Sequence, residues 1–247
     1  MPLQNIFDNN EFFEGYQKLR EREVNANNLF EIPERFSLLP DLKGLRILDL
    51  GCGTGEHCKE YIEMGAKEVT GIDISEKMLE VAKEKNADPM ITYMRMPMED
   101  LNKLDGKYDL AISSLAMHYI EDYRGVIKNV HRLLDPKGMF IFSQEHPIVT
   151  CHSGGDRWTK DENGHKLYAN LADYGIEGER DTTWFVDGIK IYHRMFSTVI
   201  NCLIEEGFVI DRITEPEPSK ELLEKYPEYY DLFHRPDFLL VRALKAE

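Results

Sequence analysis

The sequence lacks any apolar run that approaches the roughly 18 consecutive residues of a membrane-spanning helix. Its first residues lack the basic stretch followed by an apolar stretch that marks a signal peptide. Cysteine is sparse, and Cys52, Cys58, Cys151 and Cys202 have neither a C-x-x-C spacing nor the spacing of a metal site. We therefore expect a cytoplasmic protein with reduced thiols, without a membrane segment and without a bound metal.

Positive charge is also scarce. The chain has 30 lysine and arginine residues against 45 acidic ones, which gives a formal net charge of −15. Duplex nucleic acid is bound through clustered lysine and arginine, so this balance argues against nucleic acid as the main partner. The 247 residues are 42% hydrophobic and 11% aromatic, which is enough for a real core. This length predicts one large domain, or one domain with a sizeable insertion.

Short apolar runs alternate with amphipathic stretches along most of the chain. Residues 9–38 are predicted to form a mostly helical N-terminal cap (1–40), which Pro40 ends. After it, strands alternate with helices, which predicts βαβ units and a parallel sheet covered by helices on both faces. The predicted strands are 45–50, 68–72, 91–94, 108–112, 139–143, 208–213 and 237–244, and the predicted helices are 54–64, a helix that starts at 75, 123–134 and 197–206.

Residues 146–195 interrupt this alternation. They are rich in glycine and charge but contain several aromatic residues, and 184–192 are predicted to form a hairpin around Asp187-Gly188. We interpret the region as an insertion within one domain of 247 residues. Its aromatic side chains predict either a lid over a substrate or a small core of their own, and both interpretations stay open.

Three glycines, Gly51, Gly53 and Gly55, stand where the first predicted strand gives way to a helix. A turn without Cβ atoms lets a ligand approach the backbone closely, and the N–H groups that open the helix favour a negative group. Asp73 ends the second predicted strand, at a distance along the chain where an acidic residue can accept both ribose hydroxyls. The alternative is a tight turn followed by a capping aspartate. Together the two features favour a nucleoside site.

The spacing of the glycines indicates which kind of nucleoside the site binds. Dinucleotide sites use G-x-G-x-x-G, whereas this loop reads G-x-G-x-G and follows the acidic Asp49. That negative charge would repel a pyrophosphate but suits a ligand with a sulfonium or ammonium cation. An NAD(P)-dependent oxidoreductase is therefore the second hypothesis for the function. A non-catalytic binding protein is the third.

Five segments resemble the class I S-adenosylmethionine (SAM)-dependent methyltransferases, in family order. The resemblance implies a Rossmann-like sheet of seven strands, the last one antiparallel, with helices on both faces and an insertion after the fifth strand. It also implies SAM as the cofactor and a small-molecule methyl acceptor, as in the members that act on quinones and natural products. The segments are DLGCGTG at 49–55, GIDIS at 71–75, YDLAISSLAMH at 108–118, LLDPKGMF at 133–140 and EEGF at 205–208.

The resemblance implies roles for individual residues. The three glycines would pack against the methionine part of SAM, Asp73 would hold the ribose, and Ile74 would lie against the adenine. The family often has an aspartate after the third strand that meets the adenine amino group. Pro97 occupies that place here, so the Met98 backbone and Glu99 are expected to replace the contact.

Other candidates come from the N-terminal helix and the fourth strand. Tyr16 and Arg20 share one helix face because they are four residues apart. In related methyltransferases such a helix covers the cofactor, where an arginine can pair with the methionine carboxylate. The alternative is a solvated face of a packing helix. Ser114 follows the fourth strand, where the family faces the methyl group.

Methyl transfer from a sulfonium is an in-line displacement, which needs a positioned nucleophile and a pocket that excludes water. A general base is needed only if the acceptor atom carries a proton, and histidine is the usual one near neutral pH. His118 and His146 follow the fourth and fifth strands, at the edge where open α/β sheets bind ligands. Both are candidate catalytic residues. The alternative for each is a loop histidine bonded to the backbone.

Overall fold

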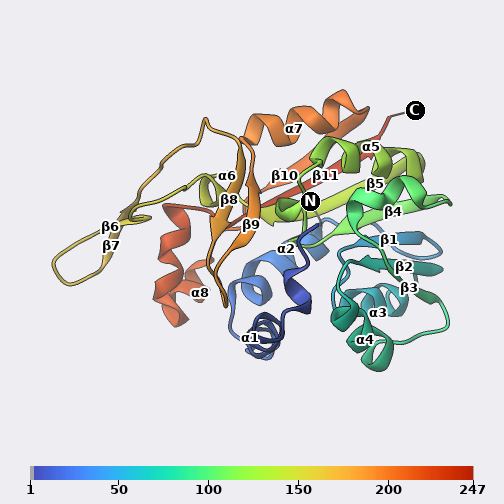
Figure 1. Cartoon of the computed structure of the whole chain (residues 1–247), viewed down its shortest axis with the longest axis horizontal. Helices are drawn as coiled ribbons and strands as arrows, with labels where there is room; N and C mark the ends of the chain where they lie inside the picture. Colours follow the sequence, from blue (N-terminus) through green and yellow to red (C-terminus); the bar gives the residue numbers. More distant parts are fainter. Residues whose placement is uncertain (1–2, 247) are drawn as a thin grey trace.

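The computed structural model describes residues 3–246 and has a seven-stranded sheet at its centre, in the order β10-β11-β5-β4-β1-β2-β3 (Figure 1). All neighbouring pairs from β5 to β3 are parallel, whereas β11 runs antiparallel to both β5 and β10. This confirms the predicted sheet and its antiparallel strand. Its strands are β1 (Arg46–Leu50), β2 (Glu68–Asp73), β3 (Ile91–Arg95), β4 (Tyr108–Ser113), β5 (Leu134–Glu145), β10 (Phe208–Thr214) and β11 (Phe238–Lys245).

Helices cover both faces of the sheet because the central strands are apolar on both sides. In β1, Leu48 and Leu50 pack into one core and Ile47 into the other, as the alternation of side chains along a strand requires. The first core contains α5 (Tyr123–Leu133) and α7 (Phe196–Glu205). The second contains α2 (Ile32–Ser37) and α3 (Glu56–Glu63), and α4 (Glu76–Lys85) packs beside β2 and β3. Among residues 3–246, no helix is both long and apolar enough to cross a membrane.

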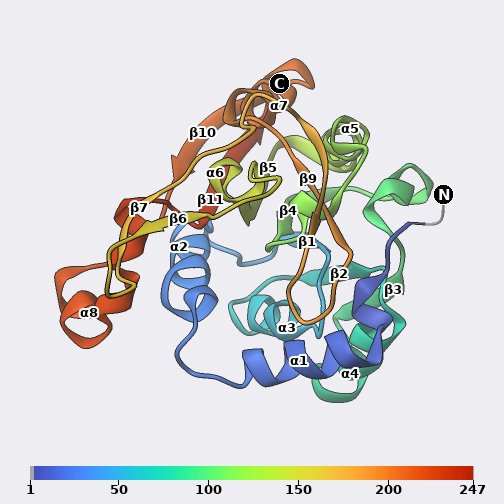
Figure 2. The same ribbon diagram turned by 60° about the vertical axis from the view of Figure 1, so that its left-hand side comes forward.

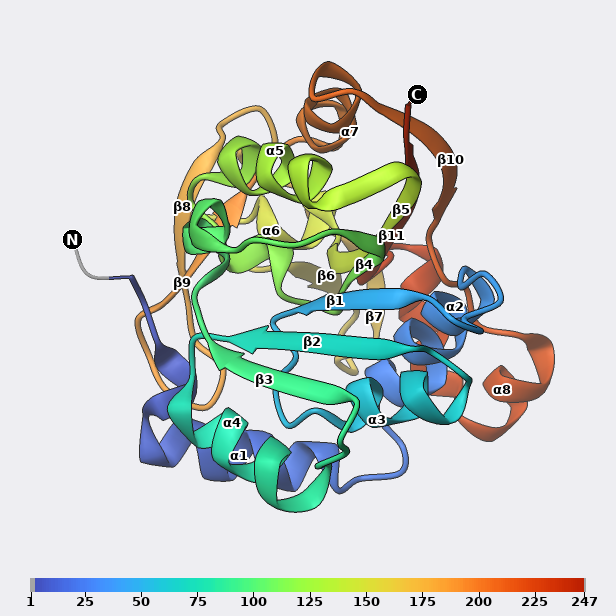
Figure 3. The ribbon, with the colours of Figure 1, turned by 90° about the vertical axis from the view of Figure 1, so that its right-hand side faces the viewer.

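The N-terminal region is helical, as predicted, but it is broken. Helix α1 (Asn10–Arg20) is followed by a bend, and a π-helical turn at Asn27–Glu31 leads into α2. Figure 3 shows α1 below the carboxyl ends of β2 and β3, on the side where the N-terminus lies. The bend therefore lets α1 lie at one edge of the sheet while α2 packs on its face.

Two predicted boundaries are wrong. Strand β5 begins at Leu134 and not at 139, because residues 135–138 form an irregularity within the strand, with Lys137 at a φ of 67°. The predicted hairpin of 184–192 is instead formed by β8 (Gly178–Thr182) and β9 (Ile189–His193). Trp184 and Phe185 lie in its loop, where both rings pack edge-on against Phe12 of α1.

The segment after β5 contains a helix and strands that the sequence did not predict. It starts with α6 (Pro147–Thr150) and a small hairpin of β6 (Trp158–Lys160) and β7 (Lys166–Ala169). In Figure 2 this hairpin lies beside α8 (Lys220–Lys225), whereas the β8–β9 hairpin reaches toward α1. The two hairpins of the insertion thus extend to different parts of the protein.

Candidate active site

A cavity of about 500 Å³ opens at the carboxyl ends of β1, β2, β4 and β5, a volume typical of small-molecule sites. Residues from four distant parts of the chain line it: the N-terminal segment with α1, the glycine loop, the ends of the central strands, and the β8–β9 hairpin. Figure 3 shows the N-terminal segment and this hairpin at the same edge of the sheet. The insertion therefore contributes to the wall of the cavity, which favours the lid interpretation.

The glycine loop forms one wall. Gly51 and Gly53 line the cavity with φ angles of +74° and +54°, a left-handed conformation that glycine adopts without strain. A Cβ on Gly53 would meet no protein atom within 4 Å and would point into open space. Gly55 does not line the cavity: it opens α3, and a Cβ there would collide with the Tyr93 hydroxyl. Only Gly53 thus leaves open space for a ligand, whereas Gly51 and Gly55 leave space for the side chains of Ala116 and Tyr93.

Asp73 is held rigidly at the end of β2. One carboxylate oxygen accepts a hydrogen bond from the Gly53 N–H at 2.9 Å and the other accepts one from the Ser75 N–H at 2.8 Å. Burial raises the pKa of this carboxyl to about 6. Asp73 lines the cavity, as predicted, and it ties the glycine loop to β2.

Asp49 lies elsewhere. Its carboxylate is buried behind the glycine loop and accepts a hydrogen bond from the Cys58 thiol at 3.2 Å. Burial raises its pKa as well. The structure does not bring this predicted cofactor contact to the cavity wall, so the influence of Asp49 on a ligand is through its charge and not through a bond.

The residues predicted around the adenine line the cavity together. Ile74 follows Asp73, and Pro97, Met98 and Glu99 follow β3. Burial raises the pKa of Glu99. Because no aspartate occupies the position of Pro97, the Glu99 carboxylate and the Met98 backbone are the groups that this wall offers to an amino group.

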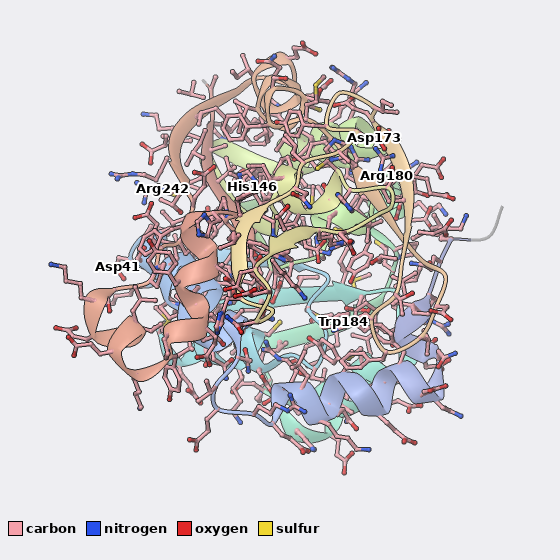
Figure 4. The ribbon with its side chains drawn as sticks, turned by 90° about the vertical axis from the view of Figure 1, so that its left-hand side faces the viewer. Asp41, His146, Asp173, Arg180, Trp184 and Arg242 are labelled. Atoms are coloured by element: carbon pink, nitrogen blue, oxygen red, sulfur yellow. The ribbon has the colours of Figure 1, made fainter. Side chains whose placement is uncertain are left out.

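One face of α1 lies toward the cavity. Tyr16 and Arg20 both line it, and Tyr16 packs edge-on against Phe7 and Trp184. The Arg20 guanidinium lies 3.7 Å from the Glu56 carboxylate. In Figure 4, Trp184 lies beside α1, where the hairpin loop and the helix close over the site.

The two candidate histidines differ. His118 lines the cavity, and its Nδ1 accepts a hydrogen bond from the Glu145 N–H at 3.3 Å. Burial, with a smaller effect of Arg194, lowers the pKa of His118 to about 3. The ring is therefore neutral with its proton on Nε2, and this nitrogen is a hydrogen-bond donor.

His146 lies outside the lining of this cavity. Its Nδ1 caps α6 by accepting from the Ile148 N–H at 3.1 Å, and its Nε2 lies 2.8 Å from the Glu215 carboxylate. Figure 4 shows it well away from Trp184. Both ring nitrogens of His146 thus have partners within the protein. This matches the alternative interpretation, in which His146 is a loop histidine bonded to the backbone.

The sequence analysis missed two acidic groups. Glu145 ends β5 and lines the cavity. Its position at the carboxyl end of a strand is the same signal that made His146 a candidate. Glu31 is buried, and one of its oxygens accepts hydrogen bonds from the side chains of Arg35, Ser114 and Ser143. It thereby ties the N-terminal region to the ends of β4 and β5. No local pattern around Glu31 indicates this contact.

Comparisons with known proteins agree with this geometry. A family described as a methyltransferase domain matches residues 47–138. An S-adenosylmethionine-dependent methyltransferase of Mesorhizobium loti is 38% identical, with a TM-score of 0.80 over 90% of this chain and 99% of that one. A Listeria monocytogenes structure named provisionally as the same kind of enzyme is 40% identical, with a TM-score of 0.81 over 88% and 97%. A Haemophilus influenzae protein named only as uncharacterized is 41% identical over 98% and 97%.

The chain therefore belongs to the class I SAM-dependent methyltransferases. The site fits the cofactor of that class. Gly53 leaves open space beside the loop, Asp73 presents a fixed carboxylate, and the described lining contains six carboxylates against the two permanent cations Arg20 and Lys190. Such a wall suits a ligand that carries a sulfonium and an ammonium group.

Proposed function

We propose that the protein transfers the methyl group of SAM to a small-molecule acceptor by in-line displacement, with proximity as the main source of catalysis and at most one general base. The observation that supports this most directly is a single cavity that runs from Asp73 at the end of β2 to Glu145 at the end of β5. We name the part around β1 and β2 the cofactor end, and the part around β4 and β5 the acceptor end.

In this proposal the cofactor end holds SAM. Asp73 binds the ribose hydroxyls, Ile74 and Met98 pack on the adenine, and Gly53 leaves room for the methionine part. Arg20 and Tyr16 cover it from α1. Bound there, SAM supplies an electrophilic methyl group on a positively charged sulfur.

At the acceptor end, Ser114 and His118 face the reacting atoms. The Nε2–H of His118 donates to the acceptor molecule and orients it, because the other ring nitrogen is held by the Glu145 backbone. The rings of Phe7, Tyr119 and Trp184 exclude water, which favours attack by a positioned nucleophile. The cavity, at about 500 Å³, has room for a small molecule and not for a macromolecule.

Calorimetry with S-adenosylhomocysteine (SAH), the demethylated product, tests the cofactor. We expect saturable binding of one ligand per chain. A folded protein that takes up no SAH at millimolar concentration would overturn the proposal. The rival oxidoreductase is tested in the same samples, because it predicts that NADH, and not SAH, raises the melting temperature.

A further inference from the structure

The acceptor end contains a carboxylate that the proposed function does not yet use. Glu145 is the last residue of β5, its side chain is partly buried, and it lines the cavity. Ligands of open α/β sheets bind beyond the carboxyl ends of the strands, so this residue stands where a substrate would lie. In strand order, β4 separates it from the glycine loop after β1 and from Asp73 after β2. Glu145 is therefore on the far side of the reacting position from the cofactor.

The charges around Glu145 leave it available. Its side chain makes no hydrogen bond and no ion pair with any residue in the range 3–246. The charges of Arg157 and Arg235 both act on Glu145, but Arg157 is exposed and Arg235 lies 3.3 Å from Asp237. His118 beside it is neutral. Tyr119 and Asp237 are the other titratable groups that sense its charge. An unpaired carboxylate on a cavity wall is free to accept a hydrogen bond from a ligand that displaces its water.

The other charges of the wall restrict the acceptor. Lys190, the permanent cation that the hairpin contributes, is paired with Glu179 at 2.6 Å, and Arg20 faces Glu56. An anionic acceptor would thus meet the Glu145 carboxylate, while both permanent cations of the described lining already face carboxylates. The aromatic rings of Phe7, Tyr119 and Trp184 suit a flat, apolar body. These features favour an uncharged aromatic molecule that carries an X–H group.

We propose that Glu145 is the general base of the reaction and that the acceptor is an uncharged, phenol-like hydroxyl compound. This rests on the proposed methyltransferase function. The Glu145 carboxylate removes the hydroxyl proton while the acceptor oxygen forms its bond to the methyl carbon. The sulfur–carbon bond breaks, its electron pair stays on sulfur, and the products are a methyl ether, a neutral thioether and protonated Glu145, which returns its proton to water.

The acid–base properties of the site agree with this role. Burial raises the pKa of Glu145 above that of an ordinary glutamate. A stronger base takes up a proton more readily from a weakly acidic hydroxyl, and catalysis is best when its pKa approaches the working pH. The adjacent His118 donates from Nε2, so the pair offers one acceptor and one donor to the same ligand.

The test uses the variant Glu145→Gln, tritiated SAM and a panel of phenol, catechol, a naphthol and 4-nitrophenol. At pH 7 we expect kcat/KM for phenol to fall about 10²- to 10⁴-fold, the usual contribution of a general base. The loss should shrink as the pH rises, because the acceptor then ionises by itself, and it should be smallest for the most acidic phenol. A merely structural role would produce neither trend.

Glu217→Gln is the matched control, because it removes the same charge from an exposed position outside the cavity lining. SAH affinity should stay unchanged in both variants. Full activity of Glu145→Gln at all pH values, or a loss of its SAH affinity, would overturn the proposal. So would a wild-type protein that binds SAH but methylates none of these phenols. A wild-type protein that fails to bind SAH would instead remove the proposed function itself.

Discussion

The cofactor end and the acceptor end of the cavity are built in different ways. Apart from Tyr16 and Arg20 of α1, the cofactor end is formed by residues close to one another in sequence, from Gly51 to Glu99, in the segments that follow β1, β2 and β3. The acceptor end combines the N-terminal segment, the ends of β4 and β5, and the β8–β9 hairpin. The cofactor end thus depends on local turns, and the acceptor end depends on contacts between distant segments.

Glu31 provides the strongest test of those distant contacts. Glu31→Ala leaves the buried Arg35 guanidinium without its carboxylate, which costs about 3–5 kcal/mol of the free energy of unfolding. For a chain of this size the melting temperature should fall by about 6–20 °C. Thermal and urea unfolding measure the change.

The double variant Glu31→Ala/Arg35→Met serves as its control. It removes the unpaired charge, so it should recover part of the lost stability. A single variant as stable as the wild type would show that this contact does not hold the N-terminal region on the sheet.

Asp73→Asn tests the cofactor end. The amide cannot accept from both ribose hydroxyls while it also holds two backbone N–H groups. Loss of a charged acceptor costs about 1.5–3 kcal/mol, so the Kd for SAH should rise about tenfold to hundredfold. The control Asp105→Asn changes an exposed aspartate outside the cavity lining. Equal Kd values in the two variants would remove Asp73 from the site.

Gly53 and Gly44 form a matched pair that separates backbone strain from lost space. Both have positive φ angles, and a Cβ on either would meet nothing within 4 Å, but only Gly53 lines the cavity. Alanine should cost each variant about 1–2 kcal/mol of stability. Only Gly53→Ala should also weaken SAH binding, by about tenfold, because its methyl group occupies ligand space. Similar SAH affinities would place the ligand away from the loop.

The pH dependence of SAH binding gives the smallest effect. Burial raises the pKa of Asp73 to about 6, so the folded protein keeps a proton there that the unfolded chain releases near pH 4. Its ionisation therefore lowers the stability of the ligand-free protein as the pH rises toward 6. The ionised form is the better ribose acceptor, so SAH affinity should fall by at most about tenfold per unit below pH 6. Calorimetry from pH 5 to 8 should show this fall in the wild type and not in Asp73→Asn.

The residue patterns were sufficient for the sheet and for the positions of Gly51, Gly53 and Asp73 on the cavity wall. Apolar strands that end in Gly51 and Asp73 predict both the topology and the positions of these residues, because the carboxyl ends of parallel strands meet at one edge. Asp49 shows the limit of this reasoning. Its place in the motif is correct, but the alternation of side chains along β1 turns it toward Cys58.

Only the tertiary structure determined which residues line the acceptor end. The packing of Trp184 on Tyr16 and the hydrogen bonds of Ser114 and Ser143 to Glu31 join residues far apart in the chain. Packing also decides that Glu145, and not the adjacent His146, lines the cavity. Burial and charge compensation act through space, so neither composition nor the spacing of residues reports them. Local periodicity fixes strands and turns, whereas packing determines which side chains meet the substrate.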